Sequence, residues 1–135
     1  MSKCPPLMVL TWAGLEAAVD LIAAQCNHRD RNGVYGCSSH GLVLAVTLSE
    51  RLSLPLLQNP TPGMILVDAV VDDRSIFIQL ANTFNDVDPW AWVDATSDKK
   101  VSSVIKLDGA CATVVMPWQD IPANCREPFL TGFHD

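Results

Sequence analysis

At 135 residues, the chain is long enough for one domain that buries roughly two-thirds of its unfolded surface. Apolar residues make up 49% and charged residues 18%, which indicates a globular protein, and the net charge of −6 argues against binding to a nucleic-acid backbone. No apolar run reaches the roughly 18 residues of a membrane span, and no signal-peptide pattern opens the chain. The five cysteines are odd in number and lack metal-ligand spacing, so we expect a cytoplasmic protein with reduced thiols.

Hydrophobic periodicity and turn residues divide the chain into alternating strands and helices. The first helix follows a possible N-cap, Thr11, and the second follows Ser38 or Ser39 and is apolar nearly all round, as expected of a buried helix. In chain order we predict a helix at 12–25, a strand at 34–36, a helix at 41–52, strands at 54–57 and 64–68, a helix at 75–83, and strands at 90–94, 104–107 and 112–116. The last two strands would flank a turn at Asp108-Gly109, and the tail from Pro117 would run over the surface.

The order of these elements predicts an α/β fold. Alternation of strand and helix from Val34 to Val93 favours a mostly parallel sheet with helices on both faces. We expect a single domain over residues 1–135, with a core at about 10–119 and a tail at 120–135.

Two loops of this expected fold carry unusual residues. Ligands bind parallel sheets where strands run into helix N-termini, which here means the loops 36–41 and 68–75. In the second loop, Asp68 follows the apolar run that begins at Met64. Behind the loops, we expect Val46 on the second helix and Leu66 on the central strand to be buried.

Three stretches stand in a specific order along the chain. Tyr35 to Leu52 has a Gly-Cys-Ser-Ser-His-Gly loop before a helix, Ile65 to Ile76 has an apolar strand with an acidic loop, and Val114 to Trp118 has an apolar-Pro-Trp end. In order and spacing they resemble the pyrophosphate loop, the ribose-phosphate loop and the base-pocket end of type I phosphoribosyltransferases of the purine-salvage kind. That family transfers a phosphoribosyl group from phosphoribosyl pyrophosphate to a nitrogenous base, with magnesium.

The resemblance implies roles for individual residues. Asp68, Asp72 and Ser75 would contact the ribose and its phosphate, with Asp72 as the catalytic residue and Asp68 as a weak magnesium ligand. Trp118 and Trp92 would line the base pocket, although the Trp-Ala-Trp alternation around Trp92 also fits a buried strand face. The pyrophosphate loop would comprise Cys37, Ser38, Ser39, His40 and Gly41.

The chain departs from the family pattern at the positions that handle phosphate. The acidic pair becomes Asp68-Ala69, and the phosphate turn is Asp73-Arg74-Ser75-Ile76 in place of Thr-Gly-x-Thr. Glycine allows backbone N–H groups to approach a phosphate closely, whereas an aspartate presents like charge. In the first loop, Ser39 and His40 replace a basic residue and a glycine of the family. The lysine that purine members place after the strand at 90–94 is also missing there.

A second register would make Asp72-Asp73 the acidic pair, but it leaves only Arg74 before the helix, too short a loop to enclose a phosphate. The joint losses favour a phosphoribosyltransferase-like protein with degraded loops, one that binds a purine nucleotide or phosphoribosyl pyrophosphate very weakly and without catalysis. Magnesium would take part only if the protein is active or binds nucleotide. Two alternatives stay open: a module that binds a protein partner without any ligand, and an active purine phosphoribosyltransferase. A homodimer is compatible with each.

Overall fold

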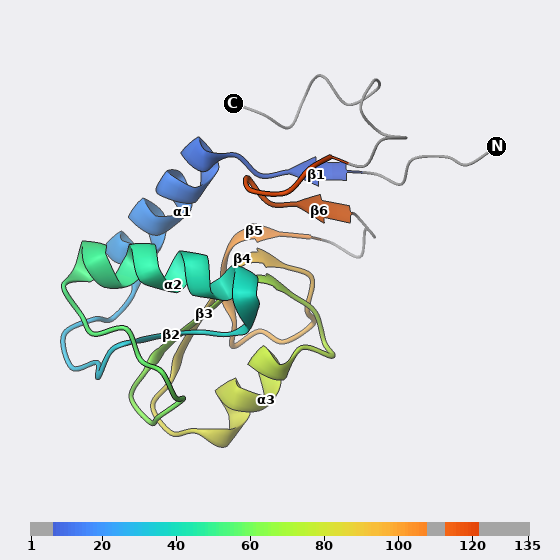
Figure 1. The fold of residues 1–135 in the computed structure, drawn as a ribbon. Coiled ribbons are helices and arrows are strands. Elements are labelled where there is room, and N and C mark those ends of the chain that lie inside the picture. The colour runs from blue at the N-terminus through green and yellow to red at the C-terminus, as the bar shows by residue number, and fades with distance from the viewer. Residues whose placement is uncertain (1–6, 108–112, 122–135) are drawn as a thin grey trace.

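The computed structural model describes residues 7–107 and 113–121. Within these ranges the helices are α1 (Trp12–Gln25), α2 (Ser38–Leu52) and α3 (Ile76–Thr83) (Figure 1). The strands are β1 (Leu7–Val9), β2 (Val34–Gly36), β3 (Ile65–Val71), β4 (Asp88–Asp94), β5 (Ser102–Lys106) and β6 (Thr113–Val115). The predicted bounds of the first helix and of the strand at 34–36 are confirmed.

Four of the strands form one parallel sheet in the order β2-β3-β4-β5. The central pair is β3 and β4, which run side by side from Ile65 opposite Asp88 to Val71 opposite Asp94. Strands β1 and β6 form a separate two-stranded parallel sheet, which lies beside the start of α1 (Figure 1). The expected α/β fold with a parallel sheet is therefore confirmed.

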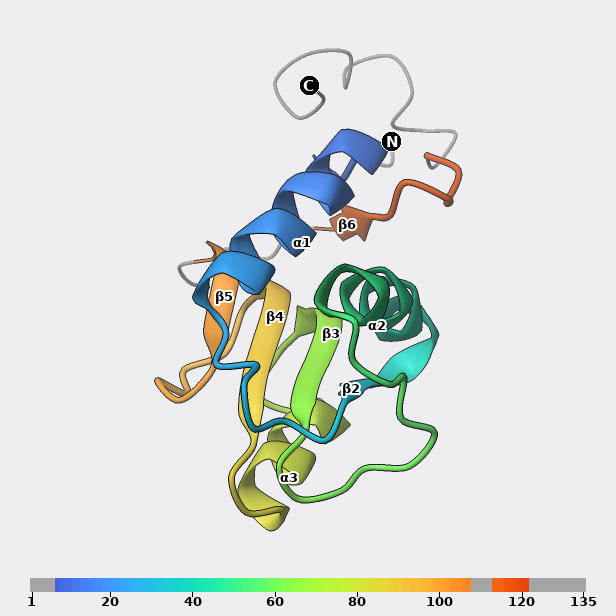
Figure 2. The ribbon, with the colours of Figure 1, turned by 90° about the vertical axis from the view of Figure 1, so that its left-hand side faces the viewer.

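Helices cover both faces of the four-stranded sheet, with α1 and α2 on one face and α3 on the other (Figure 2). Ile65 and Val67 of β3 pack in the cluster that includes α1 and α2, whereas Leu66 packs with Phe77 of α3. All three β3 side chains are fully buried. A strand covered on both faces is apolar along its length, which explains why β3 reads as a continuous apolar run.

Helix α2 is buried along one face only. Leu44, Ala45 and Leu48 are fully buried, but Val46 is 37% exposed, so the prediction that Val46 lies in the core is wrong. A helix packed on a single layer of sheet presents its opposite side to solvent, whatever the hydrophobicity of that side. The burial of Leu66 is confirmed at 0% exposure.

One strand prediction needs correction. The segment 54–57 contributes only an isolated parallel bridge between Leu56 and Val34, because it is interrupted by Pro55, which lacks a backbone donor. The strands predicted at 104–107 and 112–116 are present as β5 and β6, with β5 beside β4 and β6 beside β1 in a different sheet. The predicted turn at Asp108-Gly109 lies outside the described residues. Across the part of the chain that the structure describes, no helix is long and apolar enough to span a membrane.

Candidate ligand-binding site

The carboxyl ends of the parallel strands bring three chain segments to one edge of the sheet. The register places Val71 of β3 opposite Asp94 of β4, and Asp94 opposite Lys106 of β5. The turn after β3 and the loop after β4 therefore leave the sheet next to each other, and helix α2 begins where β2 ends. This edge is where open parallel sheets bind ligands.

Strand β3 extends three residues further than predicted, to Val71. Asp68 therefore lies within the strand, opposite Ala91, rather than at its end, and it is only 6% exposed. The valines that follow, Val70 and Val71, are β-branched residues suited to a strand, and they continue the pairing with β4. The connecting turn is thus Asp72 to Ser75, shorter than the predicted loop 68–75.

Asp68 contacts the first loop, residues 36–41, through Ser38 and Gly41. Its Oδ1 accepts hydrogen bonds from the Ser38 hydroxyl at 2.8 Å and from the Ala69 N–H at 2.7 Å. Burial raises the pKa of Asp68 to about 6, although the hydrogen bond from Ser38 favours the ionised form. Burial and the Asp68 charge also raise the pKa of the Cys37 thiol to about 11, so this thiol stays protonated at neutral pH.

Ser38 and Gly41 fit the first loop closely against β3. Ser38 has a φ of 68°, and its hydroxyl also accepts the N–H of Gly41 at 3.2 Å, which is a capping contact at the start of α2. A Cβ on Gly41 would lie 2.8 Å from Asp68 Oδ1 and 3.0 Å from its Cα, so only glycine lets α2 approach the strand this closely. Cys37, Ser38, Gly41 and Asp68 are thus brought together, and Ser39 is exposed.

His40 lies against the aromatic residues near the end of β6 instead. Its ring centroid is 5.5 Å from that of Trp118, and its Nε2 is 3.4 Å from the Gln119 side-chain nitrogen. Trp118 also contacts Trp12, with ring centroids 5.9 Å apart, and Trp12 is 57% exposed. These residues form an aromatic cluster beside the start of α2.

Trp92, the other predicted base-pocket residue, is 1% exposed and packs in the main core. It lines an apolar cavity of about 360 Å³ together with residues of β1, α1 and β5, including Met8, Gly14 and Ile105. Trp92 is not part of the aromatic cluster of Trp12, His40 and Trp118. A base pocket that uses Trp118 and Trp92 stays a prediction.

The turn after β3 uses its own side chains to satisfy its backbone. The N–H of Asp72 donates to Ser75 Oγ at 3.0 Å, and the N–H of Arg74 donates to Asp72 Oδ1 at 2.8 Å. The N–H of Ser75 donates to the Asp72 carbonyl at 3.1 Å. Asp72 and Ser75 therefore bond to each other within the turn, and their predicted contact with the ribose and its phosphate stays a prediction.

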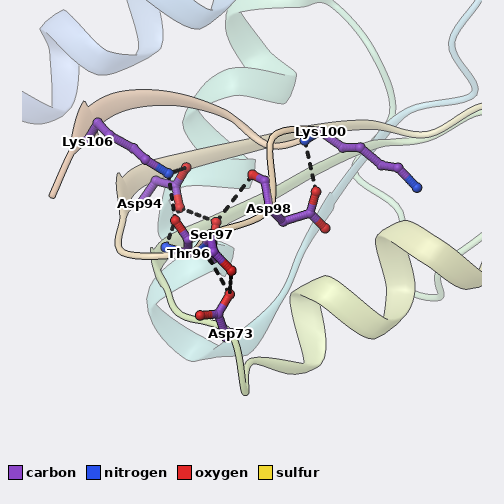
Figure 3. Close-up of polar contacts among 7 residues, drawn as sticks. All are labelled: Asp73, Asp94, Thr96, Ser97, Asp98, Lys100 and Lys106. Carbon is purple, nitrogen blue, oxygen red and sulfur yellow. Dashed lines mark hydrogen bonds and ion pairs between the residues drawn. The ribbon is translucent and has the colours of Figure 1, made fainter. Parts of the chain in front are cut away.

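A second polar network joins this turn to the loop after β4 (Figure 3). Asp73 Oδ1 accepts both the N–H of Ser97 at 2.9 Å and its hydroxyl at 3.0 Å. These hydrogen bonds lower the pKa of Asp73, and the positive charge of Lys106 acts in the same direction. Asp73 thus ties two loops together across the edge of the sheet.

Asp94, the last residue of β4, forms hydrogen bonds with the loop that follows, and its carboxylate is fully buried. Asp94 Oδ1 accepts the N–H of Thr96 at 2.8 Å and its hydroxyl at 2.6 Å. Lys106 Nζ donates to Asp94 Oδ2 at 3.1 Å and to the Thr96 carbonyl at 2.7 Å. A buried carboxylate with this many partners is fully satisfied, so the network fixes the loop.

Four residues of this network were not among the site residues predicted from the sequence: Asp94, Thr96, Ser97 and Lys106. An aspartate at the end of a strand followed by Ala-Thr-Ser-Asp is a turn signal, since such side chains bond to backbone groups two residues on. That signal could have identified Asp94 and Thr96. No pattern in the sequence links Lys106 to them, because the contact arises from the register of β4 and β5.

These residues do not fit a magnesium site held by protein side chains alone. Asp68 offers one carboxylate, which is buried and already accepts two hydrogen bonds. Its neighbour in the family's acidic pair is Ala69, which is fully buried. Among residues 7–107 and 113–121, no group of three or more His, Cys, Asp or Glu side chains could hold a metal ion.

Comparison with known proteins supports this fold. No protein-family model matches the sequence, and a search of curated proteins also finds no match. Among solved structures, a purine phosphoribosyltransferase from Pyrococcus horikoshii Ot3 is similar with a TM-score of 0.68 and 18% identity, over 86% of this chain and 95% of that one. The chain has the type I phosphoribosyltransferase fold.

Two further structures share the phosphoribosyltransferase-like arrangement. A hypothetical protein from Neisseria gonorrhoeae with bound ppGpp has a TM-score of 0.64 and 13% identity, over 93% of this chain and 95% of that one. The xanthine-guanine-hypoxanthine phosphoribosyltransferase of Helicobacter pylori has a TM-score of 0.55 and 14% identity, over 83% and 92% of the two chains. Identities this low establish a common fold for these proteins, and function has to be argued from the site itself.

Proposed function

We propose that this protein binds a purine nucleotide weakly and does not transfer a phosphoribosyl group. The observation that carries the proposal is the turn from Asp72 to Ser75, three of whose N–H groups donate to Asp72 or Ser75. In the family that the sequence resembles, backbone N–H groups of this turn bind the 5′-phosphate. A phosphate here would have to compete with hydrogen bonds that the turn already makes, and it would meet the Asp72 and Asp73 carboxylates.

The first loop supports the same proposal. Departing pyrophosphate needs compensating positive charge, and the position of the family's basic residue is held by Ser39. His40, the next residue, lies against Trp118 and Gln119. Magnesium would have to arrive with the phosphates of a ligand, since Asp68 is the one carboxylate of the acidic pair that remains. Asp68 would then orient the ion, and magnesium would neutralise phosphate charge.

The aromatic cluster supports recognition of a planar ring. Trp12 and Trp118 present an exposed indole and a partly exposed indole beside the start of α2, and aromatic faces stack on heterocycles. The bound ppGpp of the Neisseria protein makes guanine nucleotides the first ligands to test. The cytoplasmic location expected from the thiols is part of the same proposal.

The direct test is an assay of purified protein with magnesium, phosphoribosyl pyrophosphate and adenine, guanine, hypoxanthine or xanthine. We expect no mononucleotide above background, and turnover of about 1 per second, ordinary for an enzyme, would refute the proposal. Binding is tested by calorimetry with purine mononucleotides and ppGpp. The double variant Asp73→Thr, Arg74→Gly restores family residues in the turn and should bind a mononucleotide more tightly than the wild type. Ala69 is left unchanged in this variant, because it is fully buried in the main core and a carboxylate there would be unpaired.

A second candidate function is a module that binds a protein partner. The outer face of α2 favours it, because Leu42 and Val46 lie one turn apart and are 46% and 37% exposed. If no nucleotide binds to the wild type or to the double variant, this candidate replaces the first.

A further inference from the structure

Ser97 holds its two donors toward a single oxygen atom. The N–H and the hydroxyl of this exposed residue both donate to Asp73 Oδ1, at 2.9 and 3.0 Å. An amide and a hydroxyl that converge on one anionic oxygen are the donor types with which proteins bind phosphate oxygens. The oxygen they bind here comes from the chain itself.

The backbone that leads into Ser97 is held by contacts that do not involve Asp73. The preceding residue, Thr96, is fixed through its N–H and hydroxyl to buried Asp94, and through its carbonyl to Lys106 (Figure 3). None of these contacts involves Asp73. The loop would therefore keep the Ser97 N–H in position when the carboxylate is absent, and the hydroxyl could turn to donate to another oxygen beside it.

One cation lies near Ser97. The Lys106 side chain is 46% exposed, and its charge stabilises the ionised form of Asp73, although Lys106 also pairs with Asp94 at 3.1 Å. Asp72, Asp94 and Asp98 are nearby carboxylates that oppose an anion. The two donors of Ser97, and not the net charge around them, therefore carry the argument for anion binding.

We propose that Ser97, with Lys106 behind it, forms a phosphate subsite that the Asp73 carboxylate occupies, so that a phosphomonoester binds there only after Asp73 is displaced. The donors of this subsite belong to Ser97 in the loop after β4. The resemblance places the ribose phosphate on other donors, those of the turn at 72–75. The inference deepens the proposed function, because the phosphate of a weakly bound nucleotide is the occupant we expect. If Asp73 occupies the subsite, a nucleotide phosphate has to displace it, and this competition would weaken nucleotide binding in addition to charge repulsion.

The test is a titration of inorganic phosphate at pH 7.5 into ¹⁵N-labelled protein, followed by amide chemical shifts. Asp73→Ala should bind phosphate at least about tenfold more tightly than the wild type, with the Ser97 amide among the most shifted. Asp98→Ala is the matched control, because it removes the same charge one residue from Ser97 without releasing its donors. Adding Ser97→Ala to Asp73→Ala should abolish most of the gain.

Two results would overturn the subsite. One is a gain in Asp98→Ala as large as in Asp73→Ala, which would reduce the effect to net charge. The other is no gain in Asp73→Ala, or shifts confined to the loop 36–41. A measurement without ligand checks the contact itself: the Ser97 amide should exchange hydrogen faster in Asp73→Ala than in the wild type. Phosphate binding at Ser97 without any binding of purine mononucleotides would refute the proposed function alone, and nucleotide binding that leaves Ser97 unshifted would refute this subsite alone.

Discussion

Asp68 should make the protein less stable as the pH rises from about 4 to about 7. Burial raises its pKa from 3.8 to about 6, so in this window the folded state binds more protons than the unfolded state. The free energy of unfolding then falls with increasing pH, because stability rises with pH only where the unfolded state binds more protons. A difference of about 2 pKa units corresponds to roughly 3 kcal/mol, all of it lost above the folded pKa.

The variant Asp68→Asn removes this titration while keeping an oxygen for the Ser38 hydroxyl and the Ala69 N–H. Its stability relative to the wild type should therefore increase by roughly 3 kcal/mol between pH 4 and pH 7.5. At pH 7.5 itself, the variant should be more stable than the wild type by about 1–2 kcal/mol. This difference is smaller than the change with pH, because hydrogen bonds to a neutral amide are weaker than those to a carboxylate. Urea unfolding at a series of pH values measures both quantities.

Asp30→Asn controls for the loss of one negative charge, since Asp30 is exposed in the turn after α1. The difference in unfolding free energy between this variant and the wild type should stay nearly constant over the same pH range. If Asp68→Asn also runs parallel to the wild type from pH 4 to pH 7.5, the buried carboxylate does not retain its proton and the reasoning fails.

Two further predictions concern the core and the buried ion pair. Leu66→Ala should lower the free energy of unfolding by roughly 2–4 kcal/mol, while Val46→Ala, at a position 37% exposed, should cost less than about 1 kcal/mol; a larger cost for Val46→Ala would contradict the packing described for α2. Lys106→Met should cost about 1–3 kcal/mol by leaving Asp94 buried without its cation, and Lys99→Ala, in the exposed loop, should cost under about 0.5 kcal/mol. The double variant Asp94→Asn, Lys106→Met should recover part of the first loss, and simple additivity of the two changes would show that the pair is not coupled.

The fold was predictable where local pattern and burial agree. The helix at 12–25 has an apolar stripe behind a threonine whose hydroxyl does accept the Gly14 N–H, at 2.9 Å. Strand β3 has a continuous apolar run, which is typical of a strand buried on both faces of a sheet. The pairing of β1 with β6 was not predictable, because each strand has three residues and they lie about a hundred positions apart. Such short strands carry little periodicity.

The candidate site was predictable in part. The resemblance placed Ser38, Gly41 and Asp68 in two loops, and the structure brings these three residues into contact. It could not show that Asp68 is buried within β3, since a charged residue after an apolar run reads as the end of a strand. The contact between Asp73 and Ser97 joins residues 24 positions apart and depends on the neighbouring exits of β3 and β4.

The separation between core and edge means that residues at the edge of the sheet can change without loss of the fold. The side chains that hold β3 in place, such as Leu66 and Val67, are buried and lie away from the turn that follows the strand. Asp73, at the position where the resemblance expects a hydroxyl of the phosphate turn, is exposed and accepts hydrogen bonds from Ser97. Substitutions at the edge can therefore be neutral or favourable for stability while they remove phosphate contacts. A stability assay alone would not distinguish an active from an inactive turn, so the nucleotide and phosphate titrations have to decide between them.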